Sequence, residues 1–328
     1  MGLFRRRKDK EAGDKPVRLF YASDIHGTEV LWRKFLNAGK AYEADVLVMG
    51  GDLTGKAVIP LVGDESSGYE VELFGERRRV APEEVEELER QIRGKGMYPH
   101  RMSAEEVERV AAMSEEEREE WFAEVMLITF RRWLELAEER LAGSGVRCIV
   151  MPGNDDPPGV DEALEQASYV EACDGRVVEF DGYTMISLGY SNPTPFDSPR
   201  ELPEEEIARR VDELAEQVPD MSRCIFNLHV PPYDSQLDTA PELDEDLQVV
   251  MQGSKPKQIP VGSTAVRAVI ERHQPLLSLH GHVHESPGAV RIGRTLCINP
   301  GSDYHTGRIS GCLLALRGEK VTHQFVNG

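Results

Sequence analysis

The sequence predicts an α/β fold in which polar residues gather at the ends of buried strands. Short apolar runs bounded by glycine, proline or polar residues recur along the chain, as at Val17–Ala22 and Asp45–Met49. A helical pattern lies between these two runs, which gives a strand, helix, strand unit of about 30 residues. Aspartate, asparagine or histidine follows several of the runs. Ligands of open α/β sheets bind at the carboxyl ends of the strands, so the functional site should lie there.

The first unit already places ligand-type residues at the sheet edge. The strand Val17–Ala22 delivers Asp24 and His26, which stand at i and i+2 and therefore point the same way. A helix should follow, with Thr28 as its cap and apolar residues along one face. The second strand ends at Asp52. Because the two strands are parallel, Asp24 and Asp52 should emerge together.

Residues 55–145 break this rhythm and are interpreted as an insertion. We expect a β-hairpin over residues 57–74 and a glutamate-rich helical stretch from residue 82 to 141, in which Ser103 and Ser114 begin capping boxes. Between Gly75 and Arg101 the insertion carries seven basic residues against six acidic ones, so it is far less acidic than the whole chain. It could serve as a lid, an arm for a homo-oligomer or mere decoration.

Three further strand ends complete the pattern. Strands are predicted before Asn154, before His229 and, over residues 275–279, before His282 and His284. Between them we expect short helices near residues 161–169, 203–218 and 263–273, and a hairpin near residues 176–188. Residues 234–260 have the composition of a polar loop, and the last segments, from residue 289 on, that of antiparallel strands.

Composition limits the classes of function. The chain has 58 acidic and 38 basic residues, a net charge of −20. Such a field repels nucleic acid unless a basic patch opposes it, so a nucleic-acid partner is not expected. A small anionic substrate would need a local cationic centre, which metal ions can supply. No apolar run reaches the roughly 18 residues of a membrane span, so none is expected.

The cysteines and the N-terminus bear on location and domains. Five scattered cysteines without a CxxC pair are typical of a reduced, cytoplasmic protein. Residues 1–16 are basic and have no apolar signal region, which predicts a disordered tail. The rest, residues 17–328, should form one domain that carries the insertion.

The strand-end residues together form a set of metal ligands. The set comprises Asp24, His26, Asp52, Asn154, His229, His282 and His284. Each can donate a lone pair, and seven donors are too many for one ion but suit two. Asp52 is the natural bridge between them, because each carboxylate oxygen can bind one ion.

The order of these motifs resembles that of the calcineurin-like metallophosphoesterase superfamily. The resemblance runs from Val17 to about Ser302, and the insertion has no counterpart in it. It implies a four-layer α/β/β/α sandwich of two mixed sheets. It also implies one metal site made by Asp24, His26, Asp52 and His284, and a second made by Asp52, Asn154, His229 and His282.

The implied activity is hydrolysis of a phosphate ester with two divalent ions, such as manganese, iron or zinc. Two such ions with two carboxylates leave a cationic centre, which can clamp a phosphoryl group and activate a bridging hydroxide for in-line attack. Asp52 and Asn154 would take part in catalysis. Tyr190 and Asn192 lie in a loop that should contact the substrate, a small phosphodiester or phosphomonoester.

One residue departs from the family pattern. After its Gly-Asn motif the family commonly has a histidine that protonates or steadies the leaving group, and here Asp155 takes that place. Two nearby cations would keep this carboxylate ionised, so it should be a poor acid. Asp155 then turns away, binds a metal or water, or leaves protonation to another group. His100 and His305 are the substitutes to consider, and good leaving groups should be favoured.

Two other functions stay open at this stage. A nuclease or protein phosphatase would need an extended basic groove, which only residues 75–101 could supply. A metal-binding scaffold would use the insertion to hold a partner. No ligand of the set is missing, which favours the enzyme.

Overall fold

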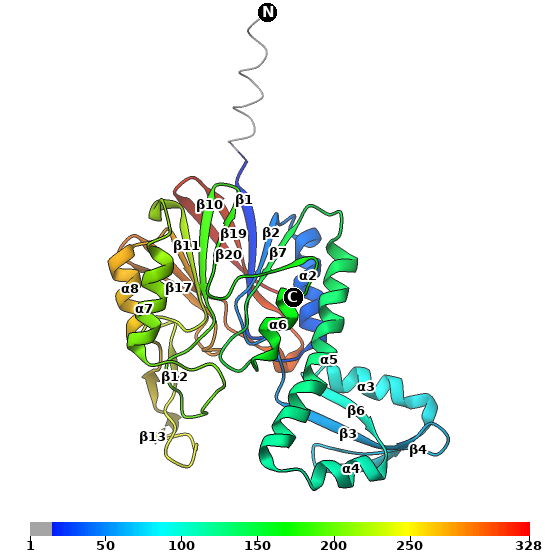
Figure 1. Cartoon of the computed structure of the whole chain (residues 1–328). Coiled ribbons are helices and arrows are strands. Elements are labelled where there is room, and N and C mark those ends of the chain that lie inside the picture. Colours follow the sequence, from blue (N-terminus) through cyan, green and yellow to red (C-terminus); the bar gives the residue numbers. More distant parts are fainter. Residues whose placement is uncertain (1–14) are drawn as a thin grey trace, which may run out of the picture.

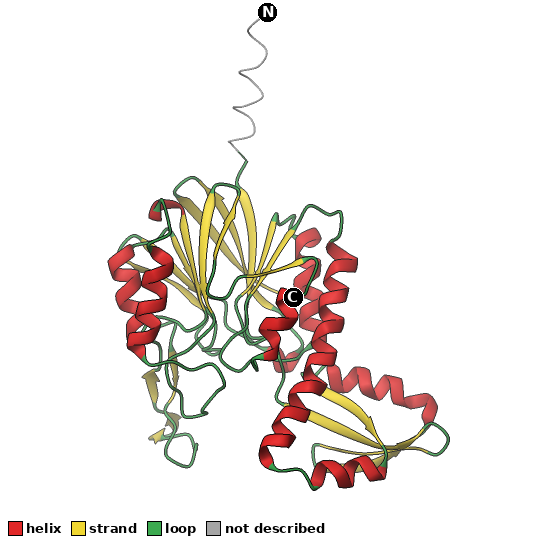
Figure 2. Ribbon diagram, in the orientation of Figure 1, coloured by secondary structure: helices red, strands yellow, loops and turns green. Residues whose placement is uncertain are grey.

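The structure is a computed structural model that describes residues 15–328, so most of the predicted basic tail lies outside the described residues. Two six-stranded sheets pack against each other, with helices on their outer faces (Figures 1 and 2). This is the four-layer α/β/β/α sandwich, so the predicted fold class is confirmed.

The first sheet has four parallel strands and an antiparallel hairpin at one edge. Its order is β20 (Lys320–Asn327), β19 (Ser310–Arg317), β1 (Val17–Ala22), β2 (Val46–Met49), β7 (Arg147–Val150) and β8 (Val170–Ala172). β1, β2, β7 and β8 run parallel, while β19 is antiparallel to both β1 and β20. The carboxyl ends of the four parallel strands therefore meet at one edge.

The second sheet repeats this plan. Its order is β17 (Gly288–Ile292), β18 (Thr295–Asn299), β16 (Leu277–Leu279), β11 (Cys224–Leu228), β10 (Tyr183–Leu188) and β9 (Val177–Phe180). The inner four strands are parallel, and β17 and β9 are antiparallel edges. The last strands of the chain thus join two different sheets, and β18 is parallel to β16, where antiparallel pairing alone was expected.

Alternation along the strands assigns residues to the layers. In β1, Leu19 and Tyr21 face the second sheet, whereas Phe20 and Ala22 face helices. The helices α2 (Glu29–Ala41), α5 (Glu115–Leu141) and α6 (Gly159–Glu165) cover the first sheet. The helices α7 (Glu204–Ala215) and α8 (Thr264–His273) cover the second. Strands buried on both faces explain the continuous apolar runs of the sequence.

Residues 57–111 form a smaller unit beside the sandwich. Its sheet has the order β5 (Glu76–Val80), β4 (Gly68–Leu73), β3 (Ala57–Asp64) and β6 (Met97–Met102). The predicted hairpin is β3 with β4. The strand β6 lies in the stretch predicted to be helical, and β5 lies between that stretch and the hairpin, where no element was predicted. A 3-10 turn, Pro82–Glu84, precedes α3 (Val85–Arg93), and α4 (Ala104–Ala111) follows β6.

Helix α5 joins this unit to the sandwich. Its first half packs on Tyr98 of β6, and its second half packs on the first sheet and α2 (Figure 1). In the second half, Trp133 stacks on Trp32 of α2. Because the helix changes partners midway, its apolar residues do not follow one stripe. Ile128, near the middle of the helix, is 47% exposed.

Local capping follows the sequence in part. Ser103 and Ser114 form the predicted capping boxes with Glu106 and Glu117. Thr28 occupies the cap of α2, but its side chain makes no capping hydrogen bond.

The segment predicted as a polar loop is a pair of short β-ladders. β12 (Thr239–Pro241) pairs with β15 (Gln258–Pro260), and β13 (Met251–Gln252) pairs with β14 (Lys255–Pro256). This arm projects from the sandwich on the side away from β3–β6 (Figure 1). The short 3-10 turns Met221–Arg223 and Tyr304–Thr306 complete the described elements.

Candidate metal centre

The seven predicted donors come from five loops at the carboxyl ends of five strands. Asp24 and His26 follow β1, Asp52 follows β2, and Asn154 follows β7; His229 follows β11, and His282 and His284 follow β16. The first three strands belong to one sheet and the last two to the other. The structure therefore brings all seven residues to the seam between the two sheets.

The loops are held in an unusual backbone conformation. Asp24, His26, Asp52 and His282 all have positive φ, between 40° and 65°. Residues other than glycine adopt this region at a cost, and such strain is found where surrounding contacts enforce it. Here the loops brace one another: the backbone N–H groups of Asp24 and His26 donate to the carbonyls of Gly51 and Asp52, at 2.9 and 3.0 Å.

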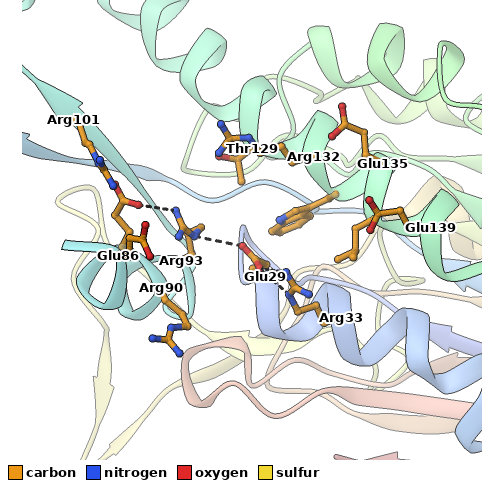
Figure 3. Close-up of a pocket in the computed structure, with 13 residues that line it drawn as sticks. Glu29, Arg33, Glu86, Arg90, Arg93, Arg101, Thr129, Arg132, Glu135 and Glu139 are labelled. Carbon is orange, nitrogen blue, oxygen red and sulfur yellow. Dashed lines mark hydrogen bonds and ion pairs between the residues drawn. The ribbon is translucent and has the colours of Figure 1, made fainter. Parts of the chain in front are cut away.

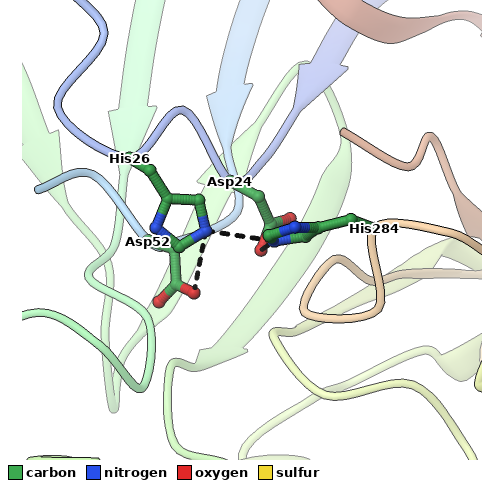
Figure 4. Close-up of side chains that lie close together, drawn as sticks. All are labelled: Asp24, His26, Asp52 and His284. Carbon is green, nitrogen blue, oxygen red and sulfur yellow. Dashed lines mark hydrogen bonds and ion pairs between the residues drawn. The ribbon is translucent and has the colours of Figure 1, made fainter. Parts of the chain in front are cut away.

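Four residues form the first group. One donor atom from each of Asp24, His26, Asp52 and His284 lies within 4.8 Å of all the others. Nε2 of His26 lies 3.0 Å from Nε2 of His284 and 3.6 Å from Oδ2 of Asp52. In Figure 4 the ring of His26 points toward both of these partners.

The second group shares Asp52 with the first. Donor atoms of Asp52, His229 and His282 also lie within 4.8 Å of one another. Oδ1 of Asn154 stands between the two imidazoles, 3.0 Å from Nε2 of His229 and 2.7 Å from Nδ1 of His282. The two groups match the two sets that the family resemblance implies.

The donor chemistry fits a pair of cations. Nδ1 of His229 lies 2.8 Å from the carbonyl oxygen of Gly50 and donates to it, so in the neutral ring the lone pair lies on Nε2. That lone pair faces Oδ1 of Asn154 and, at 3.4 Å, Oδ1 of Asp52, which are acceptors too. Converging lone pairs repel unless a cation or proton lies among them. A backbone hydrogen bond on the other ring nitrogen is also the usual support of a metal-binding histidine.

The ionisable groups in the centre are strongly coupled. Burial alone would lower the pKa of His229, but Asp52 and Asp24 outweigh it and raise the pKa to about 10. Burial would raise the pKa of Asp24, and contacts with His284 and His229 instead lower it to about 2. Burial lowers the pKa values of His26 and His282 to about 4, which favours the neutral form that metals bind.

Asp156 ties two of the loops together. Its carboxylate is fully buried and accepts hydrogen bonds from the backbone of Leu53, Thr54 and Gly153, at 2.7 to 3.0 Å, and from the Thr54 hydroxyl. The Asp52 loop and the Asn154 loop are thereby fixed to one another.

Asp155 belongs to neither donor group, and its carboxylate is bound by other side chains. Its backbone N–H donates to Oδ1 of Asp52 at 3.0 Å. Its carboxylate forms an ion pair with Lys56 and accepts a hydrogen bond of 2.8 Å from the Ser198 hydroxyl. A further contact of 3.9 Å separates its Oδ2 from Nδ1 of His26. Asp155 therefore lies beside the candidate metal centre, and the ammonium of Lys56 compensates its negative charge.

The two predicted substrate contacts lie in the loop after β10. The guanidinium groups of Arg200 and Arg210 lie 4.6 and 5.0 Å from the centre of the Tyr190 ring. Oδ1 of Asn192 is buried without a hydrogen-bond partner among the described residues. A role for either residue in binding substrate stays a prediction.

The structure adds neighbours that the motifs did not indicate. The ring centre of Tyr304 lies 4.6 Å from that of His26 and 5.7 Å from that of His284. Lys56 and Ser198 reach the centre through Asp155. Lys56 stands four residues after Asp52, so a basic residue close to the motif was the available signal; Ser198 and Tyr304 lie in loops without one.

A separate polar pocket lies where α5 meets the smaller unit. Its charged lining includes the ion pairs of Arg93 with Glu29 and Glu89, and of Arg33 with Glu29 (Figure 3). None of the seven donors lines it. Elsewhere, all five cysteines are buried and free. Among the described helices, none is both long and apolar enough to cross a membrane.

Comparison with known proteins supports the fold. No family model matches the chain. An uncharacterized protein of Methanocaldococcus jannaschii is 29% identical over 187 residues, which make up 55% of this chain and 78% of that protein. One crystal structure, 18% identical, superposes with a TM-score of 0.55 over 94% of this chain and 98% of its own.

A looser likeness is that to a dimetal phosphatase from Danio rerio. It is 10% identical, with a TM-score of 0.44 over 95% of this chain and 98% of that one, and carries no argument about activity. The four layers and the two mixed sheets are those that the resemblance in the motifs implied. The resemblance seen in the motifs is thus confirmed at the level of the fold.

Proposed function

We propose that the protein is a metal-dependent phosphoesterase that hydrolyses a small phosphodiester or phosphomonoester. The observation that carries this proposal is the pair of donor groups that share Asp52. A carboxylate placed between two sets of imidazoles is suited to hold two divalent ions at once.

The chain's own residues would hold and orient the reacting groups. Two divalent ions bound here would clamp a phosphoryl group and supply an activated water as its nucleophile. Asp24, His26 and His284 with Asp52 would hold one ion, and Asn154, His229 and His282 with Asp52 the other. The strained loops keep these donors in place before substrate arrives, so little reorganisation is needed.

A polymeric anion is a less suitable substrate. The chain has a net charge of −20, and the arginine run of β5, Arg77–Arg79, lies on the outermost strand of the small sheet. Arg77 pairs with Glu72 and Arg79 binds the carbonyl of Ser67, so part of this run is already engaged. A cytoplasmic location, a homo-oligomer built through the insertion, and manganese among the native metals remain predictions.

The test combines metal analysis with hydrolysis of chromogenic esters. Purified protein loaded with manganese, iron or zinc is assayed on bis-p-nitrophenyl phosphate and p-nitrophenyl phosphate. Asp52→Asn should lower bound metal and reduce turnover by at least about 10³-fold, because it weakens both sites. His229→Ala should also lower bound metal and turnover, and it should weaken the binding of one of the two ions.

His323→Ala is the matched control, since His323 is an exposed histidine on β20. It should leave both metal content and turnover unchanged. Metal-dependent hydrolysis that persists in Asp52→Asn would refute the proposed mechanism. A wild-type protein that binds no metal would instead favour a scaffold.

A further inference from the structure

A lysine outside the recognised motifs stands beside the candidate metal centre. Lys56 lies four residues after Asp52 and just before β3, and its ammonium pairs with the carboxylate of Asp155. Its side chain is 62% exposed, whereas the neighbouring donors Asp52 and His26 are 3% exposed. Lys56 is therefore a cation on the solvent side of the centre, where a substrate would enter.

The backbone just before Lys56 is fixed by hydrogen bonds. Thr54 donates both its N–H and its hydroxyl to Asp156. The N–H of Gly55 donates to the hydroxyl of Tyr98 at 2.7 Å. A Cβ atom on Gly55 would lie only 1.9 Å from the carbonyl oxygen of Gly96, so the chain is clamped against the smaller unit there. Such anchoring is what a positioned functional group requires.

The carboxylate of Asp155 orients the ammonium. Its Oδ1 already accepts hydrogen bonds from Ser198 and from the Asn154 amide, at 2.8 and 3.0 Å, and its Oδ2 takes Lys56. Asp155 thus holds Lys56 at the centre. The pair also removes an electrostatic conflict, because an unpaired carboxylate at this place would repel a phosphate ester.

We propose that Lys56, oriented by Asp155, forms a leaving-group subsite for phosphate esters. The inference rests on the proposed function and names the ester class that it accepts: esters of simple alcohols as well as activated aryl esters. The water oxygen forms a new bond to phosphorus and its proton passes to solvent, while the bond to the leaving oxygen breaks with its electron pair on that oxygen. The ammonium of Lys56 donates a hydrogen bond to this oxygen and stays protonated, while solvent supplies the final proton.

This proposal changes the substrate preference expected from the sequence alone. Without a group at the leaving oxygen, only good leaving groups would react well. A fixed cation that stabilises the charge developing on that oxygen matters most for poor leaving groups, where the charge is largest. Loss of Lys56 should therefore hurt alkyl esters more than nitrophenyl esters.

The experiment measures turnover across esters of p-nitrophenol, phenol and a simple alkyl alcohol, with metal-loaded protein. Lys56→Met leaves Asp155 unpaired, which should lower turnover of all the esters to the same extent. Turnover of the alkyl ester should fall by about 10²-fold beyond this common loss, and that of the nitrophenyl ester far less, as for the loss of one oxyanion donor. Lys56→Arg should recover part of the loss. Metal content and thermal unfolding temperature should equal those of the wild type in both variants.

Lys95→Met is the matched control, because Lys95 lies in the smaller unit next to Lys56 and contacts the exposed ring of Phe74. It should leave the whole series unchanged. Equal losses for all three esters, or a loss of bound metal in Lys56→Met, would overturn the subsite. If the wild type hydrolyses none of the esters with any metal, the proposed function fails instead.

Discussion

The donor loops and the smaller unit of residues 57–111 are stabilised in opposite ways. In the donor loops, charged residues are buried and backbones are strained, and hydrogen bonds between loops fix each position. In the smaller unit, two small apolar clusters support the sheet, and the ion pairs lie near the surface, such as that of Arg101 with Glu89. Surface pairs of this kind contribute about 0–1 kcal/mol each.

The difference shows where substitutions should matter. A change in the donor loops affects chemistry and stability together, because the same contacts serve both. A change in the smaller unit should affect the centre only where the two regions meet, at Gly55, Gly96 and Tyr98. The following predictions test this division, beginning with a residue that belongs wholly to the donor loops.

Asp156→Asn should have the largest effect on metal binding of these three. Whichever way the new amide turns, its NH₂ group faces a donor of Leu53, Thr54 or Gly153, so at least one buried N–H loses its acceptor. We expect a loss of about 2–3 kcal/mol in the free energy of unfolding. Metal affinity should fall by about 10–100-fold, as for other residues that support ligands. Denaturant unfolding and metal titration measure both.

Asp64→Asn serves as the control for Asp156→Asn. Asp64 also accepts four hydrogen bonds from its neighbours, here Ser66 and Ser67, but in an exposed turn of the smaller unit. Metal affinity should not change. If both variants lose metal equally, the coupling of the donor loops through Asp156 is wrong.

The donor loops were predictable from sequence because their chemistry restricts the residue types. Only a few side chains can bind metals, and each followed an apolar run that could be recognised as a strand. The structure placed Asp24, Asp52, His229 and the other predicted donors together, although their metal roles remain a proposal. Lys56 and Ser198 escaped prediction because lysine and serine are common in loops and their meaning depends on where Asp155 points.

Gly96→Ala should have the next largest effect on the metal centre, because Gly96 lies where the smaller unit meets the donor loops. Gly96 has a φ of 76°, and a Cβ atom there would lie 2.3 Å from the carbonyl oxygen of His26. Left-handed strain costs about 1–2 kcal/mol, and the clash adds about 1–3 kcal/mol. Because His26 must shift, turnover should fall as well, by up to about 10²-fold.

Gly75→Ala separates strain from clash. Gly75 has a φ of 81°, but no atom lies within 4 Å of its Cβ position. This variant should lose only the strain cost, with turnover unchanged. Equal stability and turnover in Gly96→Ala and Gly75→Ala would show that the smaller unit does not press on the His26 loop.

The smaller unit was less predictable because packing, not residue chemistry, determines it. β5 has the sequence Glu-Arg-Arg-Arg-Val, with four exposed residues and no alternation, and it forms a strand because β4 offers an edge. β6 contains a proline and a histidine and pairs with β3 from a distance in sequence. The exposed Ile128 likewise reflects a helix that packs on two bodies, which periodicity along one stripe does not reveal.

Tyr98→Phe should have the smallest effect and isolates one hydrogen bond of the junction. Removing the hydroxyl leaves the N–H of Gly55 without its buried acceptor, which should cost about 1–3 kcal/mol of unfolding free energy. Metal content should stay unchanged, since no donor contacts Tyr98. Turnover of the alkyl ester should fall several-fold, because Lys56 follows Gly55 directly and loses part of its anchoring. Tyr183→Phe is the control: its hydroxyl binds the carbonyl of Gly318, between β19 and β20. If the two variants lose similar stability and both retain full turnover, the smaller unit holds Lys56 by the glycine contact alone.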